Sequence, residues 1–90
     1  MNKVNIKVKS VKGFCSAGHK IGDEWRIDEN IFVPQNLCMH AFYVLYPWIQ
    51  TLRMGGEIPW SVNGEIDVPC IDTENMVIFS LKNEKWYRDK

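Results

Sequence analysis

Residues 36–52 read NLCMHAFYVLYPWIQTL, and this stretch decides the fold. Apolar residues recur in it at spacings of three and four, which places them on one face of an amphipathic helix. They are Leu37, Ala41, Leu45, Trp48 and Leu52. Asn36 is a favourable N-cap residue, and Gly55-Gly56 is a favourable stop signal. The stretch therefore predicts one main helix.

Pro47 lies inside this helical pattern. A proline inside a helix has no N–H to donate, and its ring clashes with the carbonyl four residues back, here that of Tyr43. The sequence therefore predicts a kink at this point, or two short helices that meet near Tyr46.

The segments around the helix predict strands. Residues 3–11 and 24–28 alternate apolar and polar side chains, which is typical of half-buried strands. The apolar run 76–81 predicts a central strand, and 85–88 a final one. Residues 57–75 read mostly as loop, with room for one short strand.

Together these segments predict a single α+β domain over residues 1–90. Its architecture would be a small antiparallel sheet, or a partly open barrel, packed against one main helix. A chain of 90 residues is long enough for one modest core.

Charge and composition narrow the classes of partner. The chain has eleven basic and eleven acidic residues, so it lacks the basic excess typical of nucleic-acid-binding surfaces. No apolar run approaches the roughly 20 residues of a membrane span. The first residues lack the apolar segment of a signal peptide. We therefore expect a cytoplasmic protein with no nucleic-acid or membrane partner.

Three cysteines and one histidine form the strongest candidate site. Cys15 and His19 share a turn punctuated by glycines, Cys38 falls at the expected start of the helix, and Cys70 follows a proline in a loop. Three cysteines cannot all pair, and a reducing compartment disfavours disulfides. Cys and His are the usual ligands of zinc and of borderline metals such as iron. Our first hypothesis is a zinc or iron site formed by these four residues.

The same residues allow a thiol-based redox protein or enzyme. The N-terminus of a helix stabilises a thiolate, which favours Cys38 as the nucleophile and leaves Cys15 as the other candidate. His19 could approach Cys38 from its loop and act as the base. His40 is two residues beyond Cys38 and is expected on a different helix face, so it is a poor base. Whether the chain is an enzyme stays open at this point.

A third hypothesis needs no chemistry at all. The cysteines would be small buried apolar residues, since free cysteine is among the most buried residue types. The chain would then bind a small molecule, a protein partner or a second copy of itself, with Trp60 as part of the contact surface. Asp72, close to Cys70, either supports a site residue or starts a turn.

A set of short motifs carries a family resemblance. They include Cys15-x₂-Gly18-His19-Lys20-x-Gly22-Asp23, Leu37-Cys38-x₂-Ala41-Phe42, Tyr46-Pro47, Leu52-Arg53-x-Gly55-Gly56, Pro59-Trp60 and Cys70-x-Asp72. As a set they resemble a family of small bacterial and archaeal proteins of unknown function. That family has proline directly after the second and third cysteines, where this chain has Met39 and Ile71. The resemblance implies that the three cysteine segments belong to one site, and it implies no activity.

Overall fold

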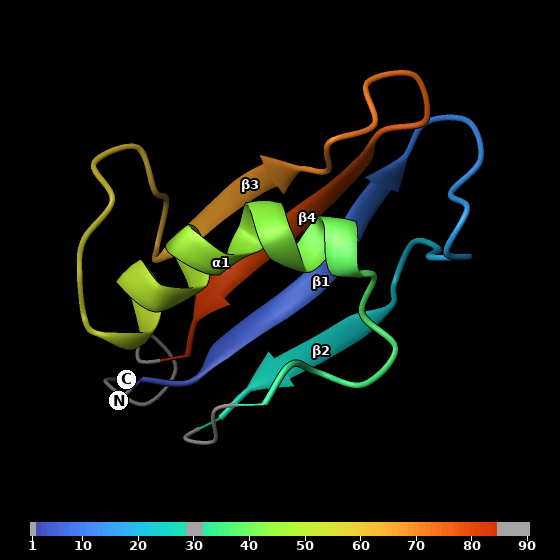
Figure 1. Ribbon diagram of the computed structural model, residues 1–90. Coiled ribbons are helices and arrows are strands. Elements are labelled where there is room, and N and C mark those ends of the chain that lie inside the picture. The colour runs from blue at the N-terminus through green and yellow to red at the C-terminus, as the bar shows by residue number, and fades with distance from the viewer. Residues whose placement is uncertain (1, 29–31, 85–90) are drawn as a thin grey trace.

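One helix lies across one face of a four-stranded sheet in the computed structural model, which describes residues 2–28 and 32–84 (Figure 1). The elements are β1 (Val4–Val11), β2 (Glu24–Ile27), α1 (Met39–Arg53), β3 (Glu65–Pro69) and β4 (Val77–Asn83). The strand order is β2-β1-β4-β3, and every neighbouring pair is antiparallel. The prediction of an α+β fold with an antiparallel sheet against one main helix is confirmed, in its open-sheet form.

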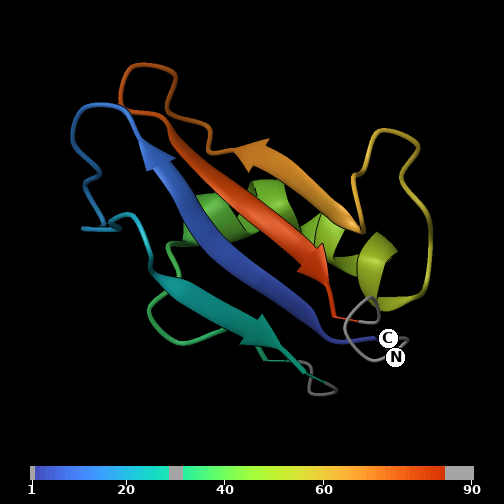
Figure 2. The ribbon, with the colours of Figure 1, turned by 180° about the vertical axis from the view of Figure 1, so that it is seen from behind.

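The two faces of the sheet differ as the alternating sequence predicts. Val4, Ile6 and Val8 of β1 point toward α1 and are fully buried. The opposite face is charged, with an ion pair between Lys9 and Asp67 at 2.6 Å. Figure 2 shows this second face without a covering helix. The strand predicted at 76–81 is also confirmed as central, because β4 lies between β1 and β3.

The helix begins later than predicted and is not split. Its N-cap residue is Cys38, so the prediction of Asn36 is wrong. Asn36 has a φ of 68°, whereas an N-cap residue needs an extended conformation. The prediction of two short helices is also wrong, because α1 continues through Pro47. The missing bond at Pro47 lies on the exposed side of α1, where water can solvate the freed Tyr43 carbonyl.

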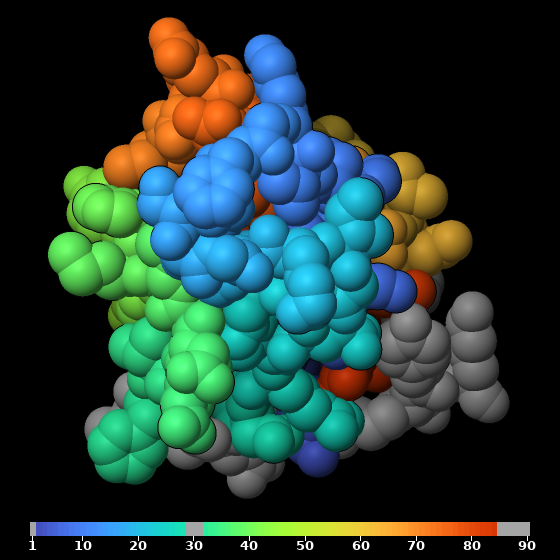
Figure 3. All heavy atoms as spheres, turned by 90° about the vertical axis from the view of Figure 1, so that its right-hand side faces the viewer, coloured from blue at the N-terminus to red at the C-terminus, as the bar shows by residue number. Residues whose placement is uncertain are grey.

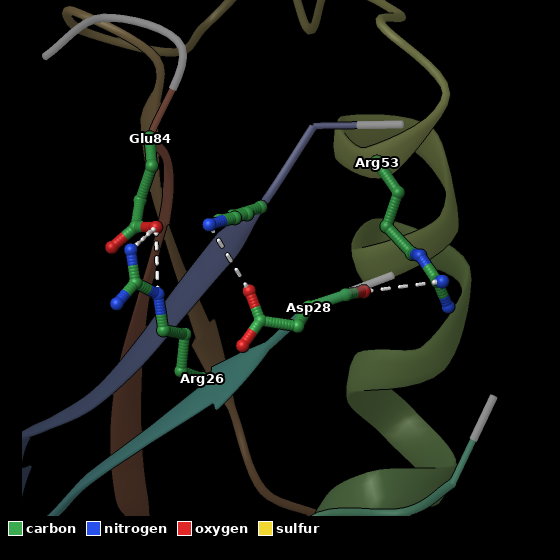
Figure 4. Close-up of polar contacts among 5 residues, drawn as sticks. Arg26, Asp28, Arg53 and Glu84 are labelled. Atoms are coloured by element: carbon green, nitrogen blue, oxygen red, sulfur yellow. Dashed lines mark hydrogen bonds and ion pairs between the residues drawn. The ribbon is translucent and has the colours of Figure 1, made fainter. Parts of the chain in front are cut away.

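The C-terminal end of α1 is tied to the sheet. It ends at the glycine pair as predicted, with Gly55 at a φ of 85°. The buried side chain of Asn83, at the end of β4, donates to the carbonyl of Leu52 at 3.3 Å. Nη2 of Arg53 donates to the carbonyl of Asp28 at 3.3 Å (Figure 4). These contacts join this end of α1 to the end of β4 and to the residue that follows β2.

The loops meet at the other end of the sheet. The connection 12–23, the approach to α1 and the connection 70–76 lie together beside the N-terminus of the helix (Figure 1). All three cysteines are in or next to these connections. The strand predicted at 85–88 lies outside the described residues. Within the described part of the chain, no helix has the length and apolar character needed to cross a membrane.

Candidate functional site

Three loops bring the three cysteines to one pocket. Cys15, Cys38 and Cys70 all line it, and its volume is about 410 Å³. His19 lines the same pocket, and Phe79 of the sheet contributes to its wall. Figure 3 views the molecule from this end, where the loops of light blue, green and orange colour meet. The four residues selected from the sequence therefore share one site, although they come from three separate segments.

His19 is the buried centre of this site, with 8% of its surface exposed. Its Nε2 accepts a hydrogen bond from the backbone N–H of Cys38 at 3.1 Å. Its ring contacts Trp25 edge-on, with 4.9 Å between centroids, and Phe79 at 6.1 Å. Burial lowers the pKa of His19 below its usual 6.5, and the nearby carboxylate of Asp23 opposes this only in part. The imidazole is therefore neutral, with Nε2 as acceptor and the proton on Nδ1.

This geometry gives His19 a structural task. The N–H of an N-cap residue has no partner inside its own helix, and His19 supplies one. The Nε2 lone pair is thereby occupied. It could serve as a metal ligand or as a base toward Cys38 only if this hydrogen bond were given up.

The predicted metal centre is not preformed. Among residues 2–28 and 32–84, no group of three or more His, Cys, Asp or Glu side chains is placed to hold a metal ion. Cys15, Cys38 and Cys70 are all free and all half-buried. Zinc or iron binding by these cysteines and His19 stays a prediction.

Cys38 occupies the position where α1 begins. Its sulfur makes no capping hydrogen bond to the helix. His40 and Ala41, in the first turn of α1, also line the pocket. The N–H groups of a first turn have no partner within their own helix, and together with the helix dipole they give this end of α1 a partial positive charge. Cys38 thus lies at the end of α1 where these N–H groups are found.

Cys70 is held differently. Its sulfur accepts the backbone N–H of Val77 at 3.3 Å and lies 3.8 Å from the carbonyl oxygen of Asp72, to which a thiol proton can be donated. The carboxylate of Asp72 accepts two backbone N–H groups, from Glu74 and Asn75, at 3.0 Å each. These bonds lower the pKa of Asp72 and show that it starts a turn, as one of the two interpretations predicted. The sulfur of Cys70 and the carboxylate of Asp72 therefore both stabilise the conformation of this loop.

The Cys15 loop is attached to the Cys70 loop. The backbone N–H of Phe14 donates to Oδ1 of Asn75 at 3.1 Å, and that of Lys12 donates to the carbonyl of Met76 at 2.8 Å. The turn itself is closed by a bond of 2.9 Å from the N–H of Gly18 to the carbonyl of Cys15. Two of the three cysteine segments thus form one connected wall of the pocket.

Sequence reasoning missed two residues of the site. His40 lines the pocket, although it was expected on another helix face. The pocket lies over the end of α1, where residues of more than one face can reach it. Asn75 was overlooked because nothing in the sequence marks an asparagine as an anchor for a distant loop. Trp60 is not in this pocket; it is 65% exposed and packs edge-on against Trp48.

Comparisons with family models, with curated proteins and with solved structures find nothing that matches this chain. The resemblance to the family of small bacterial and archaeal proteins therefore stays a prediction.

Proposed function

We propose that this chain is a thiol-based redox protein or enzyme in which Cys38 is the nucleophile. The observation that supports the proposal is that all three cysteines line one pocket at the N-terminus of α1. Cys38 is the cysteine placed at the helix terminus, a position that in general favours thiolate, and a thiolate is the reactive form of cysteine. Cys70 is less suited, because its sulfur is bonded within its own loop. Cys15 is the second candidate.

The reaction that fits three thiols in one pocket is thiol–disulfide exchange. The Cys38 thiolate attacks one sulfur of a small disulfide, the S–S bond breaks, and the departing thiolate takes a proton from water. Cys15 or Cys70, as a thiolate, then attacks the sulfur of Cys38. This step releases the second thiol and leaves a disulfide within the protein. Two electrons pass from the two cysteines to the substrate, which is reduced to two thiols.

The pocket favours a small and largely uncharged substrate. Its walls include Ala17, Ala41, Ile71 and Phe79, and its volume lies in the range of small-molecule sites. The carboxylate of Asp72 lies at the pocket but is bonded within its turn. A substrate with a compact apolar body and an accessible disulfide meets these conditions.

Alkylation rates test the proposal directly. Native protein is treated with iodoacetamide at neutral pH, and mass spectrometry follows labelling at each cysteine. We expect Cys38 to be labelled at least about tenfold faster than Cys15 and Cys70, because thiolate content sets the rate. Equal and slow labelling of all three thiols in the folded protein contradicts the proposal.

A second measurement adds the substrate. Incubation of reduced protein with a small disulfide reagent such as hydroxyethyl disulfide should produce a mixed disulfide at Cys38, followed by an internal disulfide. The Cys38→Ser variant should form neither, whereas Cys70→Ser and Cys15→Ser should each still form the mixed disulfide. If Cys38→Ser reacts as fast as the unmodified chain, Cys38 is not the nucleophile.

Metal binding is the second candidate, and the shared pocket of Cys15, His19, Cys38 and Cys70 is the observation that favours it. Binding would require the loops to move closer, and His19 would have to release the Cys38 N–H. Metal analysis of protein purified without chelator, followed by reconstitution with Zn²⁺ or Fe²⁺, tests it. Less than about a tenth of an equivalent of metal after reconstitution would rule this candidate out.

We place the protein in the cytoplasm as part of the same proposal. All three cysteines are free, and a reducing compartment keeps thiols available for exchange.

A further inference from the structure

The outer face of α1 is apolar, which is unusual for a helix that faces solvent. An exposed apolar stripe consists of Met39, Tyr43, Tyr46 and Met54, with exposed fractions of 76%, 77%, 48% and 69%. Met39, Tyr43 and Tyr46 follow one another at intervals of four and three, so they share one side of α1, and Met54 is the residue directly after its last turn. In Figure 1 this side faces the viewer, and no described segment lies in front of it.

A groove runs beside the stripe. It has a volume of about 690 Å³ and is lined by the stripe residues Met39, Tyr43 and Tyr46 with Phe42, Val44 and Pro47. All six are uncharged at neutral pH. The charged groups of the sheet, by contrast, lie on the opposite face, as the pair of Arg26 and Glu84 shows (Figure 4). The exposed apolar residues of α1 thus lie on the face away from these charges, while others, such as Phe14, Phe32 and Trp60, lie in the loops.

We propose that this face is a homodimer interface, in which the outer face of α1 packs against the same face of a second copy around a two-fold axis. In such an interface each patch meets its own copy, so like charges would oppose one another. The stripe and the groove carry no charge and therefore meet no such repulsion. A tyrosine of one copy can enter the groove of the other, which places a large side chain in a depression.

The exposed area is sufficient for a specific contact. At about 150–250 Å² for each large side chain, the stripe exposes on the order of 500 Å² per chain. Two copies would bury on the order of 1,000 Å² from the stripes alone, which is where specific interfaces begin. Phe42, Val44 and Pro47 of the groove add to this area.

A lipid surface fits the face less well. Interfacial helices combine an apolar side with flanking lysine and arginine residues that bind anionic head groups. The one lysine or arginine of α1 is Arg53, which is buried and directed toward the Asp28 carbonyl. The face therefore lacks the basic flank that membrane binding uses.

Sedimentation velocity at protein concentrations from about 1 to about 200 µM tests the proposal. This range covers the micromolar dissociation constants expected of a small interface. We expect a dimer at the upper concentrations. The double variant Tyr43→Glu/Tyr46→Glu should be monomeric throughout, because two-fold symmetry opposes the four new charges. The matched control is Ile21→Glu, which alters a residue 68% exposed in the β1–β2 connection and should remain dimeric. Circular dichroism establishes that both variants are folded.

A measurement on the unmodified chain keeps the test independent of the variants. An uncharged interface predicts a dissociation constant that changes less than about twofold between 0.05 and 0.5 M NaCl. The proposal is overturned by a monomer at about 200 µM, by a dimer that tolerates both glutamates, or by dissociation in salt. It is also overturned by a monomer that cosediments with phosphatidylcholine vesicles, which would assign the face to lipid.

Discussion

At the scale of single residues, Gly13 is the position that links the two loops of the cysteine pocket. Its φ is 77°, a conformation that side chains other than glycine rarely adopt. A Cβ placed there would collide with Oδ1 of Asn75, the atom that accepts the N–H of Phe14. We expect Gly13→Ala to lower the free energy of unfolding by about 2–3 kcal/mol, from backbone strain plus a lost hydrogen bond.

Gly18 provides the matched control for that substitution. It has a similar φ of 80°, but nothing lies within 4 Å of an added Cβ. Gly18→Ala should therefore cost about 1–2 kcal/mol, from strain alone. Chemical denaturation of both variants measures the difference. If the two cost the same, the contact between Gly13 and Asn75 does not stabilise the pocket.

At the scale of elements, the strands and the helix could be predicted because each follows from local periodicity. Alternation at 3–11 predicted a half-buried strand, and the three–four spacing at 36–52 predicted the helix. The start of α1 could not be predicted from the preference of Asn36 for N-cap positions. The helix begins where His19, from a distant loop, satisfies the N–H of Cys38. A local signal therefore failed where a tertiary contact decides the boundary.

The C-terminal end of α1 depends on a contact of the same kind. Asn83 is 5% exposed, and its Nδ2 donates to the Leu52 carbonyl, which also accepts the N–H of Gly55 at 3.2 Å and the side-chain amide of Asn2 at 3.4 Å. We expect Asn83→Ala to lower the free energy of unfolding by about 1 kcal/mol, because the buried hydrogen bond from its side chain is lost while the carbonyl keeps its other donors. Asn5→Ala, on the charged face of β1, is the control and should cost less than about 0.5 kcal/mol. Thermal unfolding measures both variants. If Asn83→Ala and Asn5→Ala lower the stability equally, the hydrogen bond from Asn83 to Leu52 does not stabilise the fold.

At the scale of the whole molecule, the sequence allowed the hypothesis that three cysteine segments meet, but no local pattern in it required them to. Each segment reads as an independent turn, and no Cys-x₂-Cys spacing marks a shared site. The order of the strands places both the β1–β2 and the β3–β4 connections beside the N-terminus of α1. That order depends on the pairing of β1 with β4, which joins residues more than 60 positions apart, such as Val4 and Asn83. The contacts of His19 also depend on how these loops pack against α1. His19, for which the sequence predicted a role as metal ligand or base, accepts the N–H of Cys38 at the start of the helix.

His19 therefore links the stability of the whole molecule to pH. Its folded pKa lies below 6.5, so between the folded and unfolded pKa values the unfolded chain binds more protons than the native one. The stability from neutral His19 is fully present above about pH 7 and is lost as the pH falls through 6.5 toward the lower folded pKa. The lowered pKa values of Asp23 and Asp72 act in the same direction, but only below about pH 4.

Urea denaturation at several values between about pH 5 and pH 7 measures this dependence. We expect the free energy of unfolding to rise with pH in this window, and the His19→Gln variant to lose most of that slope because an amide does not titrate. His40→Gln is the matched control: it removes the other histidine, which is exposed on α1, and should keep the slope. If His40→Gln flattens the profile and His19→Gln does not, the buried cap at Cys38 is not what makes folding depend on pH.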